Sequence, residues 1–96
     1  MRKSNEQSLK EAINSLLEAY HLKEKMNELE LVSCWAKIMG KSVAGKTREI
    51  TIRKKKLYIK LDSAPLRHEL MMHKQQIIDL LNEHFHEEVV NEVILS

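Results

Sequence analysis

Apolar residues in the first forty positions recur at helical spacing and form two sets. The first set falls on one helical face and consists of Leu9, Ile13, Leu16, Leu17 and Tyr20. The second set is wider and consists of Leu29, Leu31, Val32, Cys34, Trp35, Ala36, Ile38 and Met39. Ser8 and Glu11 form a capping box before the first set, and Gly40 follows the second. The pattern therefore predicts two helices, over residues 8–20 and 26–39, joined by a connector over residues 21–25.

The period of the apolar pattern changes from 3.6 to 2 after Gly40. Ile50 and Ile52 alternate with polar residues, as do Leu57, Ile59 and Leu61. Such alternation is typical of half-buried strands. The two runs are separated by a short lysine-rich segment, so we expect a β-hairpin with its turn at residues 53–56. The turn lacks the Asn-Gly or Asp-Gly pair that favours a two-residue hairpin loop, so the turn type stays open.

The last third of the chain returns to helical spacing and then ends in β-branched residues. Ser63 is placed to cap a long third helix, with Pro65 in its first turn. The segment Val89 to Leu95 reads as a final strand, which pairs either within the chain or with a neighbour. The predicted fold class is α+β, in the order α-α-β-β-α-β. We expect one domain over residues 8–96, after a flexible lead-in over residues 1–7.

Composition excludes several classes of protein. The chain has 96 residues, of which 31% are charged and 43% apolar, as expected of one small globular domain. No apolar run approaches the length of a membrane span, and the polar N-terminus does not fit a signal peptide. The single cysteine excludes a disulfide framework within the chain. These features predict a cytoplasmic protein without membrane contact.

Positive charge is concentrated in one segment. Residues 41–60 hold 8 basic residues and 1 acidic residue, whereas the formal net charge of the whole chain is only +2. The segment contains the predicted hairpin, and clustered Lys and Arg favour a polyanion through phosphate contacts. Tyr58 is the aromatic residue among these charges and is a candidate for stacking on an unpaired base. The candidate nucleic-acid-binding residues are Lys46, Arg48, Arg53, Lys54, Lys55, Lys56, Tyr58 and Lys60.

Two other readings compete with nucleic-acid binding. Lysines also protect exposed sheet edges from pairing with other chains. In the first alternative, the hairpin lysines only keep the protein soluble and bind no ligand. A protein-interaction module would instead use the wide apolar face around Trp35 and Ile38, on which Trp35 is either a core anchor or a binding hot spot. Such a module would bind a helicase or a second copy of the chain.

Catalytic and cofactor motifs have little support. Gly40 to Thr47 matches the phosphate-loop pattern G-x-x-x-x-G-K-T, but a helix is expected before it and a strand after it, which reverses the required order. His68 and His73 are five residues apart, so they diverge on a helix and do not share a metal ion. We therefore expect no enzyme activity, no cofactor and no metal.

The order of several short motifs resembles the DciA-like family, a bacterial domain long without an assigned function. The resemblance spans residues 9–95 and rests on the segment Trp35 to Gly40, Val43-Ala44, Thr47, Leu57 to Ser63, Leu66 to Leu70, Ile77 and Leu81-Asn82. It implies a KH-like domain, with helices packed on one face of a small sheet. It also implies a DNA-binding adaptor that associates with the replicative helicase. The partners expected are therefore single- or double-stranded DNA, with RNA as an alternative, and the helicase. The GXXG loop of KH domains is absent, so base clamping of that kind is not expected.

Overall fold

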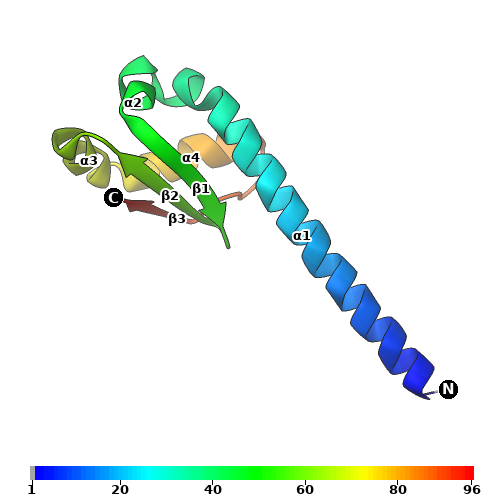
Figure 1. Cartoon of the computed structure of the whole chain (residues 1–96). Helices are drawn as coiled ribbons and strands as arrows, with labels where there is room; N and C mark the ends of the chain where they lie inside the picture. The colour runs from blue at the N-terminus through cyan, green and yellow to red at the C-terminus, as the bar shows by residue number, and fades with distance from the viewer. Residues whose placement is uncertain (1) are drawn as a thin grey trace.

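One long helix, α1 (Arg2–Met39), projects from a body formed by the rest of the chain (Figure 1). The computed structural model describes residues 2–96, with side chains described for Glu6 and from Ser8 onward. The described chain measures 62 × 22 × 21 Å, and the long dimension follows α1. Met1 lies outside the described residues. Residues 2–7, for which the sequence predicts a flexible lead-in, belong to the first turns of α1.

The prediction of two helices joined by a connector at residues 21–25 is wrong, because α1 is continuous through that segment. The segment His21-Leu22-Lys23-Glu24-Lys25 contains no glycine or proline, and Leu, Lys and Glu are good helix formers. Leu22 and Leu29 lie on the opposite side of the helix from Leu9 and Ile13. That change of side interrupts the apolar pattern without interrupting the helix.

One apolar face runs along the whole of α1, from its N-terminal half to its C-terminal half. Eighteen residues make about five full turns, so Ile13 lies directly in line with Leu31, and Leu17 with Trp35. Leu31 and Trp35 are buried in the core, whereas Ile13 and Leu17 are exposed. The face that packs on the body in the C-terminal half of α1 therefore continues past the body in the N-terminal half.

Gly40 ends α1 with a φ of 91°, a conformation that glycine adopts more readily than other residues. A short helix, α2 (Lys41–Gly45), follows and leads into the sheet. Sequence analysis did not anticipate α2. Five residues are too few for a visible apolar period, and two of the five are glycine and serine.

The sheet has three strands in the order β1-β2-β3. The hairpin is formed by β1 (Thr47–Arg53) and β2 (Lys56–Leu61), as predicted, and these strands pair antiparallel. The last strand, β3 (Glu92–Leu95), pairs parallel with β2. The final strand therefore pairs within the chain, which settles the alternative that the sequence left open.

Two helices, rather than the single long one predicted, connect β2 to β3. They are α3 (Ala64–Met71) and α4 (Lys74–Phe85). As predicted, Ser63 caps the first of them, with its Oγ accepting a hydrogen bond from the N–H of Leu66 at 3.2 Å. One straight helix over this segment would run about 33 Å, longer than the roughly 20 Å of a six-residue strand. The break at Met72-His73 lets both helices stay over the sheet.

The core lies between the inner face of the sheet and the helices. Leu57, Ile59 and Leu61 alternate inward along β2, and Val93 faces inward from β3. Helices α1, α3 and α4 complete the core with Leu31, Trp35, Leu70, Ile77 and Leu81. The fold class is α+β, as predicted. The outer face of the sheet carries no helix in Figure 1, which leaves the polar positions of the hairpin uncovered.

Candidate nucleic-acid interface

Four consecutive cationic residues form the tip of the β1–β2 hairpin. Lys54 and Lys55 are the two turn residues, with φ angles of 52° and 63°. Positive φ at both central residues is characteristic of a type I′ turn, which strongly prefers Asn-Gly. Arg53 and Lys56 flank the turn and face each other as a cross-strand pair. Like charges directly opposite each other destabilise a hairpin. The hairpin tip therefore carries both backbone strain and repulsion between like charges.

The outer face of the hairpin continues from the tip toward Tyr58 and Lys60. Tyr58 lies opposite Thr51, and Lys60 lies opposite Glu49, in the pairing of β1 with β2. The Tyr58 side of the sheet is open to solvent, and this residue is 38% exposed. The ring thus lies between the cations of the tip and Lys60, where a base stacked on it would place its phosphates beside them.

Acidic residues limit the positive field of this surface. Glu49 opposes Lys60, and Glu92 of β3 opposes Lys56 in the parallel register. Lys55 forms an ion pair with Glu88 at 3.2 Å. Within residues 2–96, no carboxylate lies within ion-pair distance of Arg53, Lys54, Lys56 or Lys60. These four cations, together with Tyr58, are the part of the predicted site that the structure brings together.

Lys46 and Arg48 lie at the other end of β1, away from the tip. Lys46 caps the C-terminus of α2. Arg48 occupies an irregularity in the ladder between Thr47 and Glu49 and pairs with Asp62 at 2.7 Å. Six residues of strand separate this end from the tip by about 20 Å. The two residues therefore form a separate group, and one of them is neutralised.

Two glutamates of α1 hold the outer edge of β1, a feature that sequence analysis missed. Glu28 accepts a hydrogen bond from the backbone N–H of Ile52 at 2.8 Å, and Glu24 accepts one from the N–H of Lys54 at 2.7 Å. The spacing of four residues places both carboxylates on the same side of the helix. They cover an edge that would otherwise offer free N–H groups, and they fix the hairpin tip against α1.

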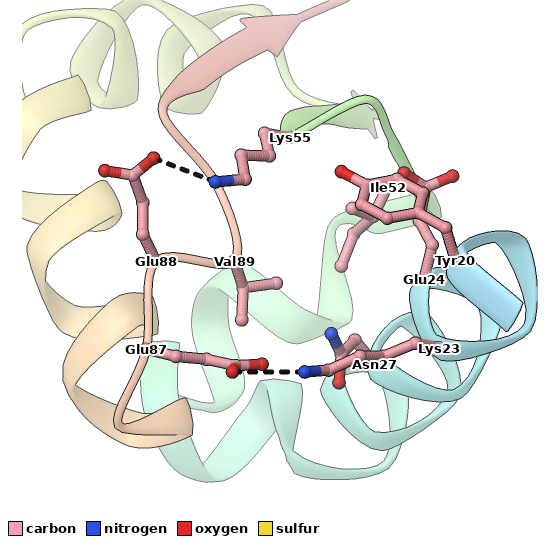
Figure 2. Close-up of a pocket in the computed structure, with 9 residues that line it drawn as sticks. All are labelled: Tyr20, Lys23, Glu24, Asn27, Ile52, Lys55, Glu87, Glu88 and Val89. Atoms are coloured by element: carbon pink, nitrogen blue, oxygen red, sulfur yellow. Dashed lines mark hydrogen bonds and ion pairs between the residues drawn. The ribbon is translucent and has the colours of Figure 1, made fainter. Parts of the chain in front are cut away.

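A cavity of about 240 Å³ lies between α1, the hairpin tip and the loop after α4. Figure 2 shows Tyr20 and Glu24 on the α1 side, near Ile52, and Val89 between two ion pairs. One ion pair joins Lys23 of α1 to Glu87 at 3.2 Å, and the other is the Lys55–Glu88 pair. Both glutamates come from one loop, which is thereby tied to α1 and to the hairpin.

The same loop is anchored from the other side by Asn82 of α4. Its Oδ1 accepts hydrogen bonds from the backbone N–H groups of Val89 and Val90, at 2.9 and 3.0 Å. Its Nδ2 donates to the carbonyl oxygen of Val90 at 2.8 Å. Val89 and Val90 are buried, so the amide satisfies backbone groups that water does not reach.

Trp35 and Ile38, the residues proposed for a protein-binding face, pack toward the body. Trp35 is 3% exposed, and its Nε1 donates a hydrogen bond to Thr47 Oγ1 at 2.9 Å. The Thr47 hydroxyl in turn donates to the carbonyl oxygen of Val43 at 2.7 Å. Ile38 is half-buried against the same core. Trp35 therefore ties α1 and α2 to the start of β1, and its ring offers little surface to a partner.

The segment that matches the phosphate-loop pattern does not form a phosphate loop. Residues 41–45 are helical, and the N–H groups of Ala44 and Lys46 are bonded within the segment, to Gly40 and Val43. The hydroxyl of Thr47 is used by Trp35 and Val43. The arrangement is helix, turn and strand, so the phosphate-cradling geometry is not formed.

No group of three His, Cys, Asp or Glu side chains within residues 2–96 is placed to hold a metal ion. None of the helices described has the length and apolar character needed to cross a bilayer.

Comparison with known proteins identifies a family. The sequence model of the family described as Dna[CI] antecedent, DciA, matches residues 8–95. No curated protein and no solved structure matches the chain. The family consists of bacterial replication factors that associate with the replicative helicase as loading adaptors and are not known enzymes. Because the match covers nearly the whole chain, the protein belongs to the DciA family.

Proposed function

We propose that this chain is a non-enzymatic adaptor of bacterial DNA replication that binds single-stranded DNA with the tip and outer face of the β1–β2 hairpin. Family membership supports the replication role. The binding surface is made of four cations and one aromatic ring, namely Arg53, Lys54, Lys56, Lys60 and Tyr58.

The observation that carries this proposal is the composition of the hairpin tip. Lys54 and Lys55 occupy left-handed backbone conformations, which cost about 1–3 kcal/mol each for a residue other than glycine. The Arg53–Lys56 pair adds repulsion between neighbouring cations. Backbone strain of this kind concentrates at functional sites. A bound phosphate backbone would relieve the repulsion, because each phosphate lies between positive groups.

Tyr58 supports single-stranded rather than double-stranded DNA as the ligand. An exposed tyrosine ring on the face of a sheet can stack on an unpaired base but not on a base inside a duplex. Stacking of one base contributes about 1–3 kcal/mol and is tolerant of sequence. The proposed binding is therefore electrostatic and without strong sequence preference.

A protein-interaction module centred on Trp35 and Ile38 has less support as the second candidate. The Trp35 ring is buried and hydrogen-bonded, so its surface is already used by the fold. A hot-spot residue needs an accessible surface before the partner binds.

Charge reversal at the tip tests the proposed function. Lys54→Glu/Lys56→Glu changes two exposed cations, and we expect affinity for a labelled DNA oligonucleotide to fall about 10- to 100-fold. The matched control is Lys37→Glu/Lys41→Glu, which makes the same change of charge at two exposed lysines of α1 and α2.

Fluorescence anisotropy at low salt measures both variants, and circular dichroism confirms that each is folded. The proposal predicts that the tip variant loses affinity and the control retains it. Equal losses in both variants would show that binding follows net charge alone and would contradict a site at the hairpin. Duplex DNA and single-stranded RNA, measured in parallel, test the choice of ligand.

A further inference from the structure

The projecting half of α1 carries an apolar stripe that the body does not cover. The overhang stripe consists of Leu9, Ile13, Leu16, Leu17 and Tyr20. These residues are between 49% and 69% exposed. They lie on the helical face that, eighteen residues later, packs Leu31 and Trp35 into the core. The stripe is thus a core-facing surface that extends beyond the core.

The described side chains of this stretch form no hydrogen bond or ion pair with the body. Lys23 is the first of the described α1 side chains to make a hydrogen bond or ion pair with the body. Isolated helices of this length are marginal in water, and most helical stability in proteins comes from packing of an apolar face. Soluble proteins rarely leave a contiguous apolar stripe uncovered. We therefore expect another protein surface to cover the overhang stripe.

We propose that a second copy of this chain covers the overhang stripe, with the two α1 helices packed antiparallel. Leu9, Ile13, Leu16 and Tyr20 are spaced by four, three and four residues, which is the a/d spacing of a coiled coil. A two-fold axis between Asn14 and Ser15 places Leu9 opposite Tyr20 of the second copy. The same axis places Ile13 opposite Leu16. Every residue of the a/d row thus meets an apolar residue.

The residues at the ends and along one flank of the stripe are also compatible with this two-fold axis. The axis places Glu6 opposite Lys23 of the second copy, which also pairs with Glu87 of its own chain, so opposite charges meet at both ends of the apolar row. Ala12 and Ala19 are small residues along one flank of the stripe, which lets the helices approach closely.

The size of the stripe sets the strength of the association. Stable interfaces bury roughly 1,200–2,000 Å² in total. Two stripes of five large side chains, each about half to two-thirds exposed, reach the lower end of that range. The dimer is therefore expected to form in the micromolar range and to dissociate on dilution.

Analytical ultracentrifugation tests the proposal with variants on opposite sides of α1. The wild-type chain should pass from monomer to dimer between about 1 µM and about 1 mM. Ile13→Glu/Leu16→Glu places charges at the centre of the stripe and should raise the dissociation constant at least about 100-fold. Leu22→Glu/Leu29→Glu changes side chains that are 63% and 61% exposed on the other side of the helix, and it should leave the dimer intact. Because all four residues are exposed, the body should fold in each variant.

Disulfide trapping tests the antiparallel direction. In a Cys34→Ser background, a mixture of the Leu9→Cys and Tyr20→Cys chains should crosslink faster than either chain alone. Crosslinking of Leu9→Cys with itself would show parallel helices and contradict the pairing. A wild-type chain that stays monomeric up to about 1 mM would overturn the proposal and leave the stripe to a different protein. Loss of the dimer in the Leu22→Glu/Leu29→Glu variant would overturn the stripe as the interface.

Discussion

Two lysines at the hairpin tip adopt backbone conformations that asparagine and glycine usually occupy. Lys54 and Lys55 have positive φ angles, and their side chains add charge where Arg53 and Lys56 already repel each other. Sequence analysis predicted the position of this turn from the alternating residues on either side. It did not predict the turn type, because the residues expected for a type I′ turn are replaced by lysines. At this site the sequence departs from the locally most stable choice, which is the behaviour expected of a functional position.

Replacing the two turn residues separates stability from binding. Lys54→Asn/Lys55→Gly installs the preferred turn pair and removes two cations, and it also removes the Lys55–Glu88 ion pair. Exposed ion pairs contribute about 0–1 kcal/mol, less than the roughly 1–3 kcal/mol per residue of the strain. We expect the free energy of unfolding, measured in urea, to rise by about 1–2 kcal/mol while DNA affinity falls. A variant that is more stable and binds DNA equally well would contradict a role for Lys54 in binding.

At the scale of elements, the relation of α1 to the sheet was the hardest feature to predict. Apolar spacing located the strands, the cap at Ser63 and the end of α1 at Gly40. The continuity of α1 was missed because the apolar residues between positions 22 and 29 lie on the other side of the helix from the core-facing stripe. The contacts of Glu24 and Glu28 with the edge of β1 were also missed. An acidic residue on a helix gives no sign of a distant backbone partner, and a glutamate is usually exposed.

The hydrogen bond from Ile52 to Glu28 predicts a specific loss of stability. Glu28→Ala leaves the N–H of Ile52 without its partner beside a buried side chain, and we expect the free energy of unfolding to fall by about 1–3 kcal/mol. Glu18→Ala is the matched control, because Glu18 is an exposed glutamate of the same helix. Urea denaturation followed by tryptophan fluorescence measures both, since Trp35 is buried in the native state. Equal stabilities of the two variants would contradict a structural role for the Glu28 bond.

At the scale of the whole molecule, the structure separates two surfaces. The sheet presents cations and Tyr58 on its outer face. Figure 1 shows no helix on that face, and it shows the N-terminal half of α1, whose apolar stripe is exposed, projecting from the body. The sequence predicted the clustering of charge along the hairpin. It did not show that Lys55 and Arg48 pair with acids, or that Lys46 and Arg48 lie far from the tip. These ion pairs and separations depend on how the chain folds in three dimensions, which the sequence pattern does not show. They reduce the candidate interface to Arg53, Lys54, Lys56, Lys60 and Tyr58.

The salt dependence of DNA binding tests the central claim most directly. For single strands, the slope of log affinity against log salt is about −0.7 per phosphate neutralised. With the four unpaired cations of the hairpin in contact, the wild-type slope should be near −3, and the Lys54→Glu/Lys56→Glu variant should have a slope shallower by about 1.4. Anisotropy titrations of one oligonucleotide at several salt concentrations give both slopes. A wild-type slope near zero, or the same slope in both proteins, would contradict binding of phosphates at the hairpin.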